Sequence, residues 1–219
     1  MIVQAAEGSA PAREAFARQY LPVVTAYFRA RWRGSRYVDA VDDATQEVFL
    51  DCFRDGGALE RVVPRGGSFR AYLYGVARYV ALRQETKGGR ARERQAPDSG
   101  LLEGIPADHP SLGRVFDRAW AERVVGQARA RHAEAAQGGG DAPRRRFELL
   151  RLRFEDGLPI RDIATKWGED PARIHHDYAD ARAEFRRHLL AAVTTYLHAP
   201  TPEAAEEECG RLLECLRME

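Results

Sequence analysis

The chain has 219 residues, of which 44% are hydrophobic and 31% are charged, and its formal net charge is +1 at pH 7. This length and composition fit a soluble protein with one domain or two small ones. The sequence argues against membrane insertion, because no apolar run approaches the ~18 residues that span a bilayer and the amino end lacks a signal-peptide pattern. Cys52, Cys209 and Cys215 form no CxxC pair, which argues against a disulfide framework or structural zinc, so we expect a cytoplasmic protein.

The first two predicted elements are helices, at 11–33 and 37–54, because apolar residues recur there at helical spacing. Pro22 lies within the first range and predicts a kink or the start of a second helix. Residues 54–67 contain two Gly-Gly pairs and a proline, which predicts a loop.

The helix predicted at 37–54 has two different faces. Its apolar face carries Val41, Ala44, Val48, Cys52 and Phe53. The opposite face, which we call the acidic stripe, carries Asp43, Gln46, Glu47 and Leu50. A solvated surface is the usual interpretation of such a stripe, although an apolar leucine within it is unusual for a solvated face.

A helix is also predicted at 69–87, with Ser68 as its N-cap. Arginines and tyrosines alternate on its polar side, which suits single-stranded nucleic acid, because bases stack on the rings while guanidinium groups contact phosphate. The alternative is that the tyrosines fill the core of a small helical domain. The residues concerned are Arg70, Tyr74 and Arg78 on one face, flanked by Tyr72 and Tyr79.

Helical periodicity is lost after this helix and then returns. Gly, Pro, Asp and Ser dominate the interval, which predicts a flexible linker. A glycine-rich insertion at 135–143 interrupts the second helical block, and Cys209, Leu212, Leu213 and Leu216 would share one face of a tail helix. We therefore predict an all-α protein with helical domains at 10–88 and 114–197, a linker at 89–113 and an acidic C-terminal extension at 198–219.

The segment 150–190 has the pattern of a helix-turn-helix. A short amphipathic helix ends at a glycine turn, and Pro171 suits the first position of a longer second helix. In such a motif the second helix enters the major groove of DNA, although many helical domains contain paired helices without binding DNA. The exposed residues expected nearest the base edges are Arg173, His175, His176 and Asp177.

Four runs of the sequence, in their order along the chain, resemble a bacterial sigma factor of the extracytoplasmic-function group. The runs are FARQYLPVVTAYFRARW, VDDATQEVFLDCF, SFRAYLYGVARYVALRQ and, in the helix-turn-helix, GLPIRDIA. The resemblance covers roughly residues 14–87 and 114–190, and implies a sigma region 2 bundle followed by a sigma region 4 helix-turn-helix.

The resemblance assigns partners to each surface. It implies that the acidic stripe, Asp43, Gln46, Glu47 and Leu50, docks on the clamp helices of core RNA polymerase. It also implies that the chain contacts the polymerase flap. It implies that Arg70, Tyr72, Tyr74, Arg78 and Tyr79 bind the melted minus-ten element of promoter DNA. It implies that Arg173, His175, His176 and Arg182 bind the minus-thirty-five element. An anti-sigma factor is a further possible partner.

The chain departs from the family pattern at a few positions. The family usually has Trp at Tyr72, Asn at Tyr79 and Asp at Arg83, and basic residues at Asp177 and Asp180. The first three differences bear on how the minus-ten element is recognised, and the acids at Asp177 and Asp180 imply a divergent promoter.

We expect no catalytic residue, no metal and no cofactor, because the sequence contains no phosphate-binding glycine loop and no metal-ligand spacing. The alternative function is a stand-alone helix-turn-helix transcription regulator, which would usually dimerise on two half-sites. A helical enzyme is the third possibility.

Overall fold

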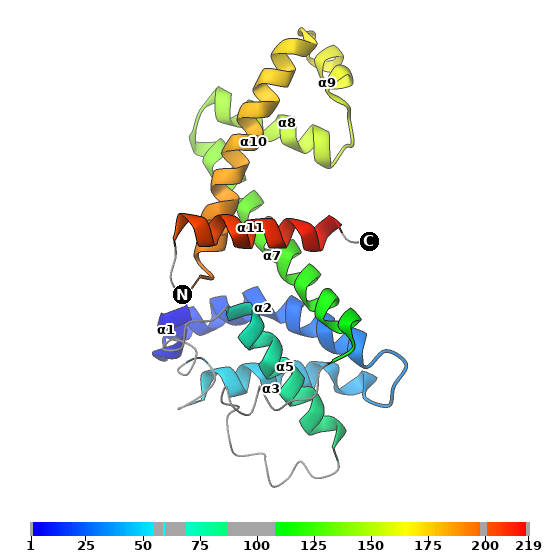
Figure 1. The fold of residues 1–219 in the computed structure, drawn as a ribbon. Helices are drawn as coiled ribbons and strands as arrows, with labels where there is room; N and C mark the ends of the chain where they lie inside the picture. The colour runs from blue at the N-terminus through cyan, green and yellow to red at the C-terminus, as the bar shows by residue number, and fades with distance from the viewer. Residues whose placement is uncertain (1, 55–58, 60–68, 87–107, 198–200, 218–219) are drawn as a thin grey trace. The chain divides into compact units, whose positions relative to one another are not determined.

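The computed structural model describes residues 2–217 except 55–58, 60–68, 87–107 and 198–200. All regular secondary structure in these described residues is helical, which confirms the all-α prediction (Figure 1). Most of the predicted loop at 54–67, the Ser68 cap and most of the predicted linker lie outside the described residues. The helices are α1 (Ile2–Ala6), α2 (Ala10–Arg31), the 3₁₀ helix η1 (Val38–Ala40), α3 (Val41–Phe53), α5 (Phe69–Glu85), α7 (Pro110–Gly138), α8 (Asp141–Phe154), α9 (Ile160–Trp167), α10 (Pro171–Thr194) and α11 (Pro202–Arg217).

The chain forms two compact units. The first unit comprises Met1–Arg123 and Thr195–Glu219, and the second comprises Val124–Thr194. The start of α7 and the whole of α11 therefore belong with α2, α3 and α5, whereas the sequence analysis assigned residues 114–123 to the second domain. No described helix is both long and apolar enough to cross a membrane.

Aromatic side chains explain why distant segments join the first unit. Trp120 of α7 is 2% exposed, and its ring stacks on Tyr20 of α2 at 5.2 Å between centroids. Phe69 of α5 lies 5.1 Å from Tyr20, and Tyr196 lies 5.3 Å from Trp120. Burial of four large rings, each removing roughly 150–250 Å² from water, makes the start of α7 and the segment after α10 part of this core.

The helix α2 runs through Pro22 without a break. Pro22 removes one backbone hydrogen bond, but it lies on the exposed side of the helix, where water can reach the carbonyl left without a partner. Buried Tyr20, Val23 and Val24 flank it and hold both halves of the helix against the core. The predicted restart of the helix at Pro22 is therefore wrong.

The second unit contains a short helix, a glycine turn and a longer helix. Gly168 ends α9 with φ +66°, a left-handed conformation that favours glycine. The Asp170 carboxylate accepts a 2.7 Å hydrogen bond from the Ala172 N–H at the start of α10. The short helix and the longer helix share a buried apolar cluster with α8, formed by Leu149, Leu152, Ile160, Ile163, Ala164 and Ile174.

The predicted insertion at 135–143 is almost entirely helical. The helix α7 extends to Gly138 and α8 begins at Asp141, so only Gly139 and Gly140 separate them. A Cβ on Gly139 would lie 2.7 Å from Cγ of Pro143 and 2.8 Å from the Ala135 carbonyl oxygen. Glycine is needed there for the close turn between the two helices.

Candidate functional site

The acidic stripe lies on α3 as the sequence predicts, with three of its residues exposed. Asp43 and Gln46 are exposed, and Leu50 is 68% exposed. The opposite face of α3 is buried and fixes the rotation of the helix, with Val41, Ala44, Val48 and Cys52 in the core and Phe53 half-buried.

Glu47, the fourth residue of the stripe, is held by α5. Its carboxylate forms an ion pair with Arg83 and accepts a 2.9 Å hydrogen bond from the Gln84 side chain. Arg83 also lies 3.3 Å from buried Asp51, which pairs with Arg54 at 2.9 Å. Burial raises the pKa of Asp51, while Arg83 and Arg54 act in the opposite direction. Glu47 therefore joins α3 to α5 as well as contributing charge to the stripe.

On α5, Arg70, Tyr74 and Arg78 lie along one side of the helix, and we call them the arginine–tyrosine face. All three side chains are half-buried. Side chains that are available to bind nucleic acid would instead be exposed. Tyr72 and Tyr79 flank this face and are also half-buried, with the Arg83 guanidinium 5.4 Å from the Tyr79 ring centroid.

Three carboxylates contact the arginine–tyrosine face: Asp108 just before α7, Asp117 on α7 and Glu208 on α11. We call these three residues the carboxylate cluster. Arg70 forms an ion pair with Asp117, and its Nε lies 3.6 Å from a Glu208 oxygen. The Tyr74 hydroxyl donates a 3.0 Å hydrogen bond to Asp108, and the Nε of Arg78 lies 3.7 Å from the same carboxylate.

Asp108 also belongs to a deeper polar network. The Tyr27 hydroxyl donates to it at 2.8 Å, and Arg31 bridges it to Glu85. Trp32 donates a 2.7 Å hydrogen bond to Glu85 through its indole N–H. Burial raises the pKa of the Tyr27 hydroxyl, so it stays protonated and remains a donor.

Sequence reasoning missed the carboxylate cluster. Asp108 fell in the predicted linker, Asp117 in the other predicted domain and Glu208 in the tail. The only signal available was the acidic composition of the tail, which gave no indication of the partner side chains.

On α10, the residues predicted to contact the minus-thirty-five element are all exposed. Arg173 lies 3.3 Å from Glu169, and His176 lies 3.9 Å from Asp180. The Arg182 guanidinium lies 5.7 Å from the Tyr178 ring centroid. The exposed residues are Arg173, His175, His176 and Arg182, in the first half of α10.

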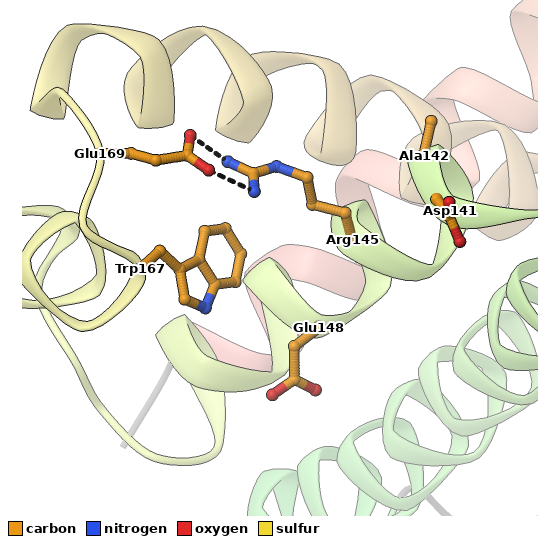
Figure 2. A pocket seen from close by; sticks show the side chains of 6 residues that line it. All are labelled: Asp141, Ala142, Arg145, Glu148, Trp167 and Glu169. Atoms are coloured by element: carbon orange, nitrogen blue, oxygen red, sulfur yellow. Dashed lines mark hydrogen bonds and ion pairs between the residues drawn. The ribbon is translucent and has the colours of Figure 1, made fainter.

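Asp177 has a structural role that the sequence did not reveal. Its carboxylate accepts a 2.9 Å hydrogen bond from Nε of Arg145 on α8. The two Nη atoms of Arg145 donate to Glu169 at 2.8 and 2.7 Å, and its guanidinium lies 4.4 Å from the Trp167 ring centroid (Figure 2). Arg145 therefore holds the turn and α10 together at a shallow pocket lined by Asp141, Ala142, Arg145, Glu148, Trp167 and Glu169.

The candidate surfaces are thus built from charged and aromatic side chains. Among the described residues, no three His, Cys, Asp or Glu side chains are grouped so that they could hold a metal ion. No protein-family model matches the chain, and no curated protein or solved structure matches it either.

Proposed function

We propose that this chain is an RNA polymerase sigma factor of the extracytoplasmic-function type, which directs the core enzyme to specific promoters and aids their melting. The observation that carries the proposal is the acidic stripe. It combines exposed carboxylate and amide groups with Leu50, which is 68% exposed although it is apolar. Acidic groups steer association with a basic partner, and a central apolar side chain supplies the area buried on docking.

The exposed residues of α10 support the second part of the proposal. They lie in the first half of a helix that follows a tight glycine turn, which is the position of base-contacting residues in helix-turn-helix proteins. Arginine donates to the acceptor atoms of guanine in the major groove. The Arg145 network braces this helix against α8, so the exposed side chains are carried on a rigid element.

The arginine–tyrosine face supports a role in holding unpaired DNA. Its two guanidinium groups and the tyrosine ring between them are the chemistry that binds phosphates and stacked bases. Melting then needs no catalytic group, because contacts to the opened strand become available only after the duplex separates.

The first experiment measures binding to purified core RNA polymerase. The variant Asp43→Arg/Leu50→Ser reverses one charge and removes the apolar side chain while leaving the Glu47–Arg83 pair intact. We expect the affinity for core polymerase to fall at least about a hundredfold, because the free-energy costs of losing a steering charge and an apolar contact add. Co-elution on a sizing column and a titration of labelled chain against core enzyme provide the readout.

The matched control is Glu7→Arg/Leu21→Ser, which makes the same two kinds of change at exposed positions outside α3. It should bind core polymerase like the unaltered chain. Equal binding by all three proteins would contradict the docking role. The chain would instead be a stand-alone helix-turn-helix regulator if it did not bind core polymerase, formed a stable dimer and bound duplex DNA tightly.

A further inference from the structure

The carboxylate cluster occupies the surface that the arginine–tyrosine face would offer to DNA. We infer that Asp117 and Glu208 act as an intramolecular mask, which lies on Arg70 in the free chain and must be displaced before α5 binds single-stranded DNA. This inference rests on the proposed function, because it assigns a regulator to the DNA-binding face of α5.

The charges and burial at Arg70 support a mask. Its side chain is 20% exposed and contacts two carboxylates from different segments, Asp117 of α7 and Glu208 of α11. The Glu208 side chain is 7% exposed and also lies 3.0 Å from Arg211. Carboxylate oxygens present the same charge and hydrogen-bond acceptors as phosphate oxygens, so they fill the position of a DNA backbone.

The helix α11 is suited to come off without unfolding the rest of the first unit. It has a narrow buried side, formed by Ala205, Glu208, Cys209 and Leu212, and one of these four residues is a carboxylate. Leu213, on the face expected to be apolar, is 38% exposed. A short segment with little buried apolar surface opens at lower free energy than the surrounding core.

Asp108 differs from the other two carboxylates. It is bound to Tyr27 and Arg31 of α2 as well as to α5, so it belongs to the core of the first unit. Of the two carboxylates on Arg70, Glu208 can leave with α11, whereas Asp117 stays on α7 and can only turn its side chain, which is 35% exposed, away from Arg70. The test leaves Asp108 unchanged.

The test uses the full chain with Asp117→Asn/Glu208→Gln, which keeps side-chain shape and removes both charges from Arg70. The probe is a fluorescent single-stranded DNA of about 15 nucleotides, within the range of known site sizes. We expect binding about tenfold tighter than for the unaltered chain, because one charge-assisted contact becomes available to phosphate. The plot of log affinity against log salt concentration should steepen by roughly 0.7, the value for one phosphate contact to a single strand.

The matched control is Glu203→Gln/Glu207→Gln, which removes two charges from exposed positions of α11. It should leave DNA binding unchanged, and adding Arg70→Gln to the unmasked variant should abolish its gain. An equal gain in the control, no gain in the unmasked variant, or a gain that survives Arg70→Gln would each overturn the mask.

A measurement on the unaltered chain guards against a variant that folds poorly. Hydrogen exchange should show that amides of α11 lose protection when saturating single-stranded DNA is added, while amides of α3 do not. Full protection of α11 in the DNA complex would overturn the mask. If the variant bound DNA more tightly but the chain did not bind core polymerase, the result would support the mask and reject the proposed function.

Discussion

His132 of α7 is a buried titratable residue that no candidate surface uses. Its side chain is 1% exposed, and Nε2 lies 3.6 Å from buried Glu184 of α10. Arg146 forms an ion pair with the same glutamate, and the His188 ring lies 5.2 Å away. Burial lowers the pKa of His132 below its usual value of 6.5, although Glu184 acts in the opposite direction.

The lowered pKa of His132 predicts that the second unit loses stability in acid. In the pH range between the folded-state pKa and 6.5, the unfolded chain binds more protons than the folded chain, so the free energy of unfolding falls as pH falls through this range. Below the folded-state pKa this loss levels off. We expect His132→Gln to show a smaller fall than the unaltered chain in urea unfolding between pH 7 and pH 5. The exposed control His175→Gln should show the same fall in the free energy of unfolding as the unaltered chain. Identical pH dependence of all three proteins would contradict His132 as the cause.

Single residues also show where sequence reasoning stops. Asp177 and Arg83 stood out because they differ from the family pattern, but their partners lie 32 and 36 residues away, on α8 and α3. The pairing depends on how helices pack, which periodicity does not specify. In contrast, the exposure of Asp43, Gln46 and Leu50 followed directly from the apolar spacing on the other face of α3.

At the scale of elements, most helices could be predicted because their apolar residues recur every three or four positions. The breaks were harder. Pro22 and the three glycines at 138–140 are strong helix-breaking signals. Tertiary packing nevertheless keeps α2 continuous through Pro22 and leaves only a two-residue turn at the glycines. The assignment of residues 114–123 failed for a similar reason, because Trp120 finds its stacking partner about a hundred residues earlier in the chain.

Trp120 provides a test of which unit the start of α7 belongs to. We expect Trp120→Ala to destabilise the first unit by about 3–5 kcal/mol, the usual cost of removing a fully buried large aromatic side chain. Hydrogen exchange should then accelerate in α2 and α5 and stay unchanged in α9.

The comparison variant is Val38→Ala, which truncates a side chain that is 51% exposed and should change stability by less than about 0.5 kcal/mol. Faster exchange in α9 together with unchanged exchange in α2 would show that residues 114–123 belong to the second unit, as the sequence had suggested.

At the scale of the whole molecule, the surface proposed to bind polymerase and the surface proposed to bind duplex DNA belong to different units. The acidic stripe lies in the first unit, and the exposed residues of α10 lie in the second. The net charge of +1 gives no hint of this division, because acidic and basic residues nearly cancel over the chain.

This division makes a prediction for transcription. Run-off assays with core polymerase and genomic fragments should yield discrete transcripts only when the chain is present. Arg173→Ala/Arg182→Ala should reduce these transcripts at least about tenfold, because each arginine contact to DNA contributes roughly 1–3 kcal/mol. The same variant should bind core polymerase normally. Transcripts that persist at full yield would contradict the role of α10, and lost core binding would contradict the separation of the two surfaces.

The first unit is discontinuous in the sequence, since Tyr196 and α11 return to a core begun by α2. During synthesis on the ribosome, Val124–Thr194 emerges as one uninterrupted stretch and can fold as soon as it is complete. The helices of the first unit that are made earlier must wait for Tyr196 to leave the exit tunnel before their own core closes. The unit that begins first is therefore completed after the second unit, and chains that end just before Tyr196, once released from the ribosome, should be cleaved by proteases in α2 more readily than in α10.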